Sequence, residues 1–317
     1  MTCRLDEVMA LRLRLQAWPW PDPDAAYESL RELFGTLIEG AQRIHEHRVA
    51  DLLTGLVMLT APRPRRFGRP EAKVVLLLDP EVPDARSWAA TLLEEISPHL
   101  GEHCTLGLRL QDRSLLEILE PLGFGPTKLW LVGSVEAALA RMRSGTIDPR
   151  TLGVDIVPLE LEQVGRVNDL MRDFFLANPH LGFGDQCLSA QEQAEIDAEQ
   201  REQLEREVRG GQQTHFTISR NGEILGYCGF YSHPAHPLLG SCAGANIVLL
   251  PPLQGMGLGR ATYLHLFERM HSLGLGTVYG LTSNPAVIHL GRQQGRVPRS
   301  ILMRRDGPFI PRHFIPS

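Results

Sequence analysis

The chain has 317 residues, of which 43% are hydrophobic and 22% charged, and its formal net charge at pH 7 is −5. These values are typical of a globular protein of about two domains, and they give no basic surface for nucleic acid. No apolar run is long enough to span a bilayer, and the first residues lack a signal peptide. The five scattered cysteines fit no zinc pattern, so we expect reduced thiols, a cytoplasmic location and no metal site.

The chain contains two copies of one plan, displaced by about 171 residues. Leu53-Thr54-Gly55 matches Ile224-Leu225-Gly226, and Leu78-Asp79-Pro80 matches Leu249-Leu250-Pro251. In each copy we expect two strands around a turn, a strand that ends at a proline, a helix, a further strand and a short helix. The strands are predicted at 74–78, 104–110, 247–250 and 277–282. This predicts an α/β fold with a mixed α+β sheet, in two tandem domains at residues 1–146 and 147–317.

A glycine-rich loop follows the predicted strand at 247–250 in the second copy. Residues 251–260 read Pro-Pro-Leu-Gln-Gly-Met-Gly-Leu-Gly-Arg and open an amphipathic helix. Glycine allows close approach of a ligand to the backbone, and unpaired N–H groups at a helix start bind phosphates. We therefore expect a pyrophosphate at this loop, held by residues Gln254, Gly255, Met256, Gly257, Leu258, Gly259 and Arg260.

Three other interpretations of the glycines compete with this one. A dinucleotide-binding fold needs an acidic residue after the next strand, but that strand ends in Leu281-Thr282-Ser283. A Walker loop needs a Lys-Ser/Thr pair, which is missing here. A plain tight turn stays open as an alternative. In the first copy Asp84, Arg86 and Trp88 replace the three glycines, so we expect that copy to have lost the cofactor.

The second copy resembles the GNAT family of acyl-CoA N-acyltransferases from about residue 154 to 304. The resemblance rests on Gln254 with the three glycines after Pro251, and on Asn284 leading a short helix that ends at Gly295-Arg296, where the family has Gly-Phe. The first copy resembles a degenerate member from about residue 49 to 131. The paired arrangement is similar to that of mycothiol synthase, although no substrate motif is shared.

The resemblance implies roles for individual residues. Backbone groups of Ile247, Val248 and Leu249 would pair with the pantetheine arm, and an N–H at Val248 or Leu249 would polarise the acyl carbonyl. The charge of Arg260 would lie near the pyrophosphate. Asn284 would hydrogen-bond the pantetheine arm, and it is also a good helix N-cap before Pro285.

The catalytic acid and base are less clearly marked. The family's acid is a tyrosine on the short helix, and that position is Gly291 here. Ser283 is an alternative acid, while His289 is expected to face away from the site. His233 is the candidate base, with His236 beside it, and either can instead be an exposed loop histidine. The loop at 178–185 is where the family sets acceptor specificity, and the acidic helix at 191–209 is either a solvated face or a lip for a cationic acceptor.

Together these observations predict an acetyl-CoA-dependent N-acetyltransferase. The acyl group, from acetyl-CoA or another acyl-CoA, would pass directly to an amine of a small-molecule or peptide acceptor. Because Gly291 replaces the usual acid, an inactive acyl-CoA sensor is the first alternative. A protein-interaction module built from the paired domains is the second.

Overall fold

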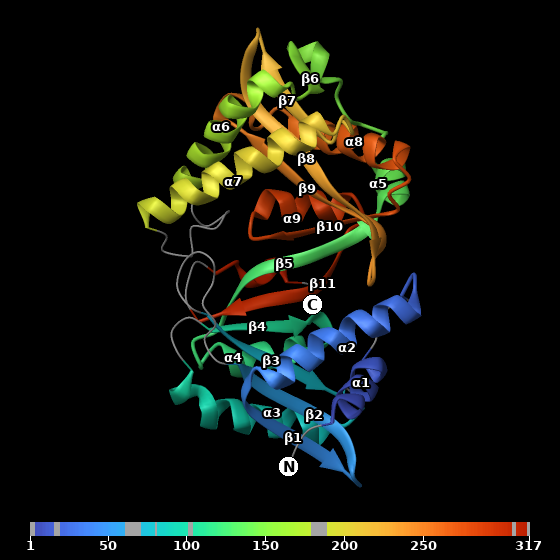
Figure 1. The fold of residues 1–317 in the computed structure, drawn as a ribbon, viewed down its shortest axis with the longest axis vertical. Helices are drawn as coiled ribbons and strands as arrows, with labels where there is room; N and C mark the ends of the chain where they lie inside the picture. The colour runs from blue at the N-terminus through green and yellow to red at the C-terminus, as the bar shows by residue number, and fades with distance from the viewer. Residues whose placement is uncertain are drawn as a thin grey trace. The chain divides into compact units, whose positions relative to one another are not determined.

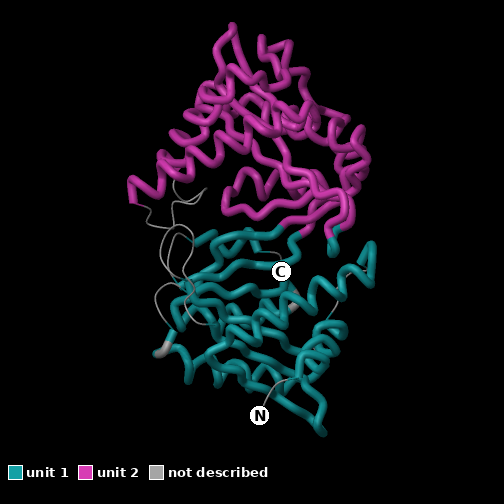
Figure 2. Tube along the Cα trace, viewed as in Figure 1, with its two compact units in different colours: residues 1–130, 237–239, 298–317 teal, residues 131–236, 240–297 magenta. Residues whose placement is uncertain are grey.

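The fold is described from a computed structural model that covers residues 4–15, 20–60, 71–79, 81–100, 104–178, 189–305 and 309–315. The chain forms two compact units (Figure 2). Unit 1 comprises Met1–Trp130, Pro237–Leu239 and Pro298–Ser317, and unit 2 comprises Leu131–His236 and Gly240–Val297. The extents of the two predicted copies, 1–146 and 147–317, stay a prediction. Among the helices of the described segments, none is long and apolar enough to cross a membrane.

Unit 1 contains a mixed sheet whose strands follow the order β1-β2-β3-β4-β11 (Figure 1). The β3–β4 pair is parallel and the other pairs are antiparallel. Its strands are β1 (Ala41–Val49), β2 (Leu52–Thr60), β3 (Ala72–Leu78), β4 (Cys104–Arg109) and β11 (Val297–Arg304). Its helices are α1 (Leu5–Arg14), α2 (Pro23–Glu39), α3 (Pro83–Ile96) and α4 (Leu116–Leu119). The strand β5 (Gly125–Ser134) begins in this unit and continues into unit 2.

Local sequence explains the elements that cover this sheet. The side chain of Asp22 caps α2 by accepting a hydrogen bond from the Ala25 N–H at 3.0 Å, and Pro23 occupies the first helical position. Ala26, Leu30 and Phe34 recur every four residues and form the buried stripe of the helix. This stripe packs with α1 and β2 in one core cluster, so the apolar strand β2 is buried along nearly its whole length.

The strands of unit 2 are hydrogen-bonded in the order β10-β9-β8-β7-β6 (Figure 1). The β9–β10 pair is parallel and the others are antiparallel. Its strands are β6 (Val154–Pro158), β7 (His215–Arg220), β8 (Glu223–His236), β9 (Gly240–Leu249) and β10 (Thr277–Thr282). Its helices are α5 (Val135–Met142), α6 (Val164–Ala177), α7 (Ala190–Arg209), α8 (Leu258–Ser272) and α9 (Pro285–Gln293).

The two faces of the unit 2 sheet carry different core clusters because side chains alternate along each strand. Cys228 and Phe230 of β8 pack with α5 and α8 on one face. Tyr227 of the same strand packs with α6, α7 and Val248 of β9 on the other face. A site on the second face is therefore built from β8 and β9 together with α6 and α7.

The first copy differs from the second where the glycine-rich loop is expected. The helix α3 begins at Pro83, so Asp84 and Arg86 lie within its first turn. In the second copy the residues at the matching positions precede the helix, which begins only at Leu258. The glycine-rich loop therefore has no counterpart in unit 1, because the helix extends through its position.

Arg109 bridges the ends of β3 and β4 in unit 1. Residues 72–74 of β3 pair with residues 104–106 of β4, and the two strands have no further pairs after Val74 and Leu106. Arg109 Nη2 donates to the Leu78 carbonyl at 2.8 Å, and its Nε donates to Asp112 Oδ2 at 2.6 Å. The separation is thereby closed by a side chain of the protein itself.

Candidate functional site

In unit 2 the strands β9 and β10 separate after a short parallel pairing. Three residues pair on each strand, 242–244 of β9 with 277–279 of β10. β9 continues to Leu249, and no further pairs join it to β10 within these two described strands. The edge of β9 at Ile247, Val248 and Leu249 is bonded to β8 on one side and open on the side of β10. Unpaired main-chain groups at such an edge can pair with an extended ligand.

The glycine-rich loop lies directly after this open edge. Gln254 Nε2 donates to the Leu249 carbonyl at 2.7 Å, which ties the loop to the end of β9. Gly255 and Gly257 have left-handed backbones with φ of +75° and +78°, which glycine adopts without a steric penalty. Gly257 is the N-cap of α8 and no side chain among the described residues caps the helix, so the N–H groups of Leu258 and Gly259 are available to an anion, while the Arg260 N–H donates to the Gly257 carbonyl at 3.1 Å.

The third glycine has a packing role. A Cβ at Gly259 would lie 3.3 Å from Leu290 Cδ1 of α9, so glycine allows α8 and α9 to approach closely. Met256 is half-buried and Leu258 is buried in the core beside α5. The loop therefore joins the two helices and the open strand edge into one constellation.

The guanidinium of Arg260 has different partners from those expected. Its Nη2 donates to the carbonyls of Arg141 and Ser144 at 2.9 and 3.0 Å, and its Nε donates to Thr146 Oγ1 at 2.9 Å. These acceptors lie at the end of α5, where the helix dipole is negative and a cation is stabilising. The side chain therefore holds α5 and the following turn on α8, while its N–H remains at the start of α8.

Asn284 adopts the N-cap arrangement that the sequence allows. Its Oδ1 accepts a hydrogen bond from the Ala286 N–H at 2.9 Å, with Pro285 at the first helical position of α9. The cap uses Oδ1 alone, so Nδ2 can still donate to a ligand. Ser283 is buried just before it, between β10 and α9. His289 is exposed and contacts Gln293 on its own helix, in agreement with the expected direction of its side chain.

Gly291 lies in a filled part of the protein. A Cβ there would lie 2.9 Å from Leu131 Cδ1 and 3.3 Å from Arg296 Nε. Arg296 is 3% exposed, and its guanidinium carbon lies 5.0 Å from the centre of the Tyr263 ring. Its Nε and Nη2 have no hydrogen-bond partner among the residues that the structure describes. The two departures from the family pattern are thus one physical change, because the small Gly291 makes room for the large Arg296.

Replacing Gly291 by alanine is expected to lower the free energy of unfolding by about 1–2 kcal/mol, because overpacking exceeds the gain in helix propensity. Urea denaturation followed by circular dichroism measures the change. Gly165→Ala in α6 is the matched control, since its nearest neighbour would lie at 3.7 Å, and it should leave stability unchanged or slightly higher. Equal stability of Gly291→Ala and the natural protein would contradict the close packing around Gly291.

A cavity of about 410 Å³ lies beside the end of β8 that carries the candidate base. His233 is exposed and lines it, while His236 is half-buried 6.1 Å from the His233 ring. Burial and the nearby His233 lower the pKa of His236. The lining residues come from α7, the segment after it and β8: Gln203, Glu207, Gly210, Gln212, Thr214, Phe230, Tyr231, Ser232 and His233.

Sequence reasoning missed the polar residues behind this cavity. His215 and Tyr227 are buried and hydrogen-bonded at 2.7 Å, and Glu207 of α7 hydrogen-bonds the other ring nitrogen of His215. The one sequence signal is the alternation of Tyr227, Gly229 and Tyr231, which places them on one face of a strand. Residues 179–188, which include nearly all of the predicted acceptor loop at 178–185, lie outside the described residues.

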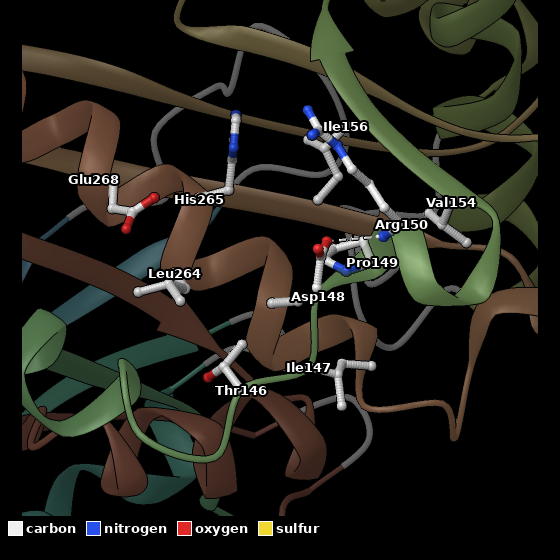
Figure 3. Close-up of a pocket in the computed structure, with 11 residues that line it drawn as sticks. Thr146, Ile147, Asp148, Pro149, Arg150, Val154, Ile156, Leu264, His265 and Glu268 are labelled. Carbon is white, nitrogen blue, oxygen red and sulfur yellow. Dashed lines mark hydrogen bonds between the residues drawn. The ribbon is translucent and has the colours of Figure 1, made fainter.

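A second cavity, of about 420 Å³, lies beside α8 (Figure 3). Leu264, His265 and Glu268 line it from the helix, and segment 146–150 lines it with Val154 and Ile156. His265 Nε2 is buried without a hydrogen-bond partner, and burial lowers the pKa of this imidazole. This cavity shares no residue with the open edge of β9 or with the polar residues around His215, so we do not assign it to the candidate site.

Residues 172–295 match the model of the acetyltransferase (GNAT) family, and no curated protein matches the chain. A GCN5-related N-acetyltransferase from Sphaerobacter thermophilus is structurally similar, with a TM-score of 0.52 and 13% identity over 89% of this chain and 87% of that chain. A tandem GNAT protein from the clavulanic acid biosynthesis pathway gives a TM-score of 0.45 and 16% identity over 96% and 95% of the two chains. A GNAT-family acetyltransferase from Colwellia psychrerythraea gives 0.47 and 12% over 87% and 95%.

At these identities the structural likeness concerns the fold alone. Of these three proteins, the one from Sphaerobacter thermophilus has a TM-score above 0.5 and carries the argument. Together with the family match, it confirms the predicted fold class, a mixed α/β fold of this family.

Proposed function

We propose that the second copy, whose residues 172–295 match the model of the GNAT family, is an N-acetyltransferase that uses acetyl-CoA or another acyl-CoA. The observation that carries the proposal is the open edge of β9 followed directly by an uncapped helix start at Gly257. An acyl-CoA has an extended amide-bearing arm and a pyrophosphate, and these are the two groups that such an edge and such a helix start bind.

Different residues of the second copy would bind different parts of the acyl-CoA. Main-chain groups of Ile247, Val248 and Leu249 would pair with the pantetheine arm, and an N–H at Val248 or Leu249 would polarise the thioester carbonyl. The N–H groups of residues 255–260 would hold the pyrophosphate, and Asn284 Nδ2 would donate to the arm. Nothing lies within 4 Å of a Cβ placed at Gly255, so the loop leaves room for the phosphates.

The proposed reaction is direct transfer to an amine, without a covalent enzyme intermediate. The amine nitrogen attacks the thioester carbonyl carbon, the carbon–sulfur bond breaks, and the thiol leaves. His233 lines the 410 Å³ cavity, which supports a role for it at the acceptor, and Ser283, buried between β10 and α9, is the proposed acid. The acceptor would be an amine of a small molecule or a peptide. Among the described cysteines, Cys228 and Cys242 are buried thiols outside any disulfide, which supports a reducing, cytoplasmic compartment.

We propose that the first copy binds no acyl-CoA. The helix α3 extends through the positions of the missing loop, and Arg109 bridges the separation between β3 and β4. Trp88 lies over Gly55, where a Cβ would come within 3.0 Å of its ring. These side chains leave unit 1 without the open strand edge on which the second copy depends.

Isothermal titration of the full chain with acetyl-CoA tests the proposal. We expect one site per chain, unchanged by Arg86→Ala because Arg86 lies in α3 of unit 1. Thiol release in the presence of primary amines then separates an enzyme from a sensor, because a sensor binds acetyl-CoA without transferring its acyl group. Two sites per chain, or none, would overturn the assignment of acyl-CoA binding to the second copy alone.

A further inference from the structure

Four polar side chains form an unbroken chain on the α6–α7 face of the unit 2 sheet. Glu207 of α7 hydrogen-bonds His215 Nε2, and His215 Nδ1 lies 2.7 Å from the hydroxyl of Tyr227. Tyr227 in turn hydrogen-bonds the hydroxyl of Tyr231. Tyr231 lines the 410 Å³ cavity together with Gln203 and Glu207 of α7. Both ends of this hydrogen-bonded chain, Tyr231 and Glu207, therefore line the cavity, while its middle members His215 and Tyr227 are buried.

Gly229 makes this arrangement possible. It pairs with His215 across β7 and β8 and lies on the same face as Tyr227 and Tyr231. A Cβ at Gly229 would lie 2.4 Å from His215 Nδ1 and 2.6 Å from the Tyr227 oxygen. The missing side chain is thus the space in which the imidazole and the phenol meet.

The donor and acceptor groups of the four side chains determine which atom donates in each of their hydrogen bonds. The ionised carboxylate of Glu207 can only accept, so His215 carries its hydrogen on Nε2. Nδ1 of the neutral ring then accepts from the hydroxyl of Tyr227, whose oxygen accepts from Tyr231. Burial lowers the pKa of His215, while the contact with Glu207 raises it and so opposes that effect. The ring is therefore neutral at pH 7 and has a lone pair to receive a proton through Tyr227.

The open end of the chain lies level with the point at which β9 and β10 separate. Tyr231 pairs with Gly244 of β9, and Tyr279 of β10 pairs with the same glycine from the other side. This is the last residue pair before the strands diverge. Tyr231 therefore borders the cavity and lies level with the start of the open edge of β9.

We propose that Tyr231, Tyr227, His215 and Glu207 form the proton relay that serves as the general base of the acyl transfer, with Gly229 as the positioning residue; this inference rests on the proposed function. When the amine nitrogen bonds to the thioester carbon, it loses one proton to Tyr231. Tyr231 passes its own proton to Tyr227, and Tyr227 passes its proton to His215 Nδ1. The resulting imidazolium is paired with Glu207. The carbon–sulfur bond breaks with its electrons on sulfur, and the thiolate takes a proton from Ser283, the proposed acid, which regains a proton from water. His215 later returns its proton to water.

The cavity favours a small cationic amine as the acceptor. Among its described lining residues, Glu207 has the one side chain with a full charge at pH 7. A carboxylate at a cavity wall attracts an ammonium group and raises its local concentration. The relay then acts on the neutral fraction of the amine that reaches the thioester carbon.

Steady-state kinetics of the full chain with acetyl-CoA and three amine probes, 1,4-diaminobutane, spermidine and glucosamine, tests the relay. We expect Tyr231→Phe and Gly229→Ala to lower kcat by about 100-fold, the lower range of general-base effects, and to leave the KM for acetyl-CoA unchanged. The controls are Tyr27→Phe on α2 and Gly107→Ala on β4, where an added Cβ meets nothing within 4 Å, and both should retain full activity.

The pH profile separates a relay from a structural role. Glu207, Tyr227 and Tyr231 are the titratable groups that face His215, and the pKa values of both tyrosines are raised by burial, so the acid limb of kcat/KM belongs to His215, whose own pKa is lowered by burial. We expect that limb to lie below pH 6.5 and to vanish in His215→Gln. Nitrogen-15 NMR of labelled histidine should show His215 with its proton on Nε2 at pH 7.

The outcomes are distinct. If the natural protein does not bind acetyl-CoA, the proposed function itself is overturned. Binding without transfer to any of the three amines overturns the relay as a base for amine acceptors. The relay is overturned if Tyr231→Phe and His215→Gln keep the kcat and the acid limb of the natural protein. It is also overturned if His215 carries its proton on Nδ1. Neither result affects the proposal that the second copy binds acyl-CoA.

Discussion

Replacing Gly257 by glutamate is expected to weaken acetyl-CoA binding at least 100-fold, about 2.7 kcal/mol. The backbone of Gly257 has φ of +78°, and a side chain in that conformation costs about 1–2 kcal/mol. The new Cβ would also lie 3.3 Å from Ile147 Cδ1. Most importantly, the carboxylate would stand at the uncapped start of α8 and repel the phosphates that this helix end is proposed to hold. Isothermal titration of the full chain measures the loss.

Two further variants separate charge from backbone strain. Gly274→Glu places the same side chain at the opposite end of α8, at φ of +72° with no atom within 4 Å, and should leave acetyl-CoA affinity unchanged. Gly257→Asn keeps a residue that tolerates the left-handed region and adds no charge, so it should retain most of the affinity. Equal binding by Gly257→Glu and the natural protein would place the pyrophosphate elsewhere.

Replacing Asp112 by alanine is expected to lower the free energy of unfolding by about 3 kcal/mol. The Asp112 side chain is 2% exposed and accepts from Arg109, whose side chain is 19% exposed. Burial raises the pKa of Asp112, while Arg109 and Arg86 lower it. Without this carboxylate, Arg109 would be left beside Arg12, whose own pKa is lowered by burial and by Arg109. Urea denaturation at pH 7 measures the change.

The control for this ion pair is an exposed one. Asp173→Ala removes a carboxylate that is 68% exposed beside Arg172, and its effect should stay within about 0.5 kcal/mol. The double variant Asp112→Leu with Arg109→Met should recover part of the loss, because it removes both buried charges. A loss below 1 kcal/mol for Asp112→Ala would mean that the bridge across β3 and β4 is not held by this pair. Acetyl-CoA affinity should be unchanged in each variant, since the proposed site lies in unit 2.

The parts that follow from local sequence were the most predictable. The glycine-rich loop leads into α8 at Leu258, where the predicted helix begins, and Asn284 caps α9 as its position before Pro285 suggests. The acidic helix predicted at 191–209 is observed as α7, with Ser189 and Glu192 forming a capping box. Glycine φ preferences and capping residues act within a few positions, so a single sequence reports them well.

The parts that depend on long-range contacts were not predictable in the same way. Nothing near Arg260 shows that its guanidinium is satisfied by carbonyls more than 110 residues earlier. Glu207, His215 and Tyr227 come from one helix and two strands, and only the sheet register brings them together. The coupled change at Gly291 and Arg296 likewise needs the packing of α9 to be known, although both departures from the family pattern were visible in the sequence.

The place of β11 has a consequence for work with fragments. This last strand of the chain pairs with β4 from Ser300↔Arg109 to Arg304↔Thr105 and is part of unit 1. Expressing residues 1–146 and 147–317 separately would therefore leave β4 with an unpaired edge in the first product and β11 without its partner strand β4 in the second. Unpaired strand edges promote aggregation. Co-expressing the two halves should let them reassociate through this ladder, so that soluble protein is recovered only when both are made together.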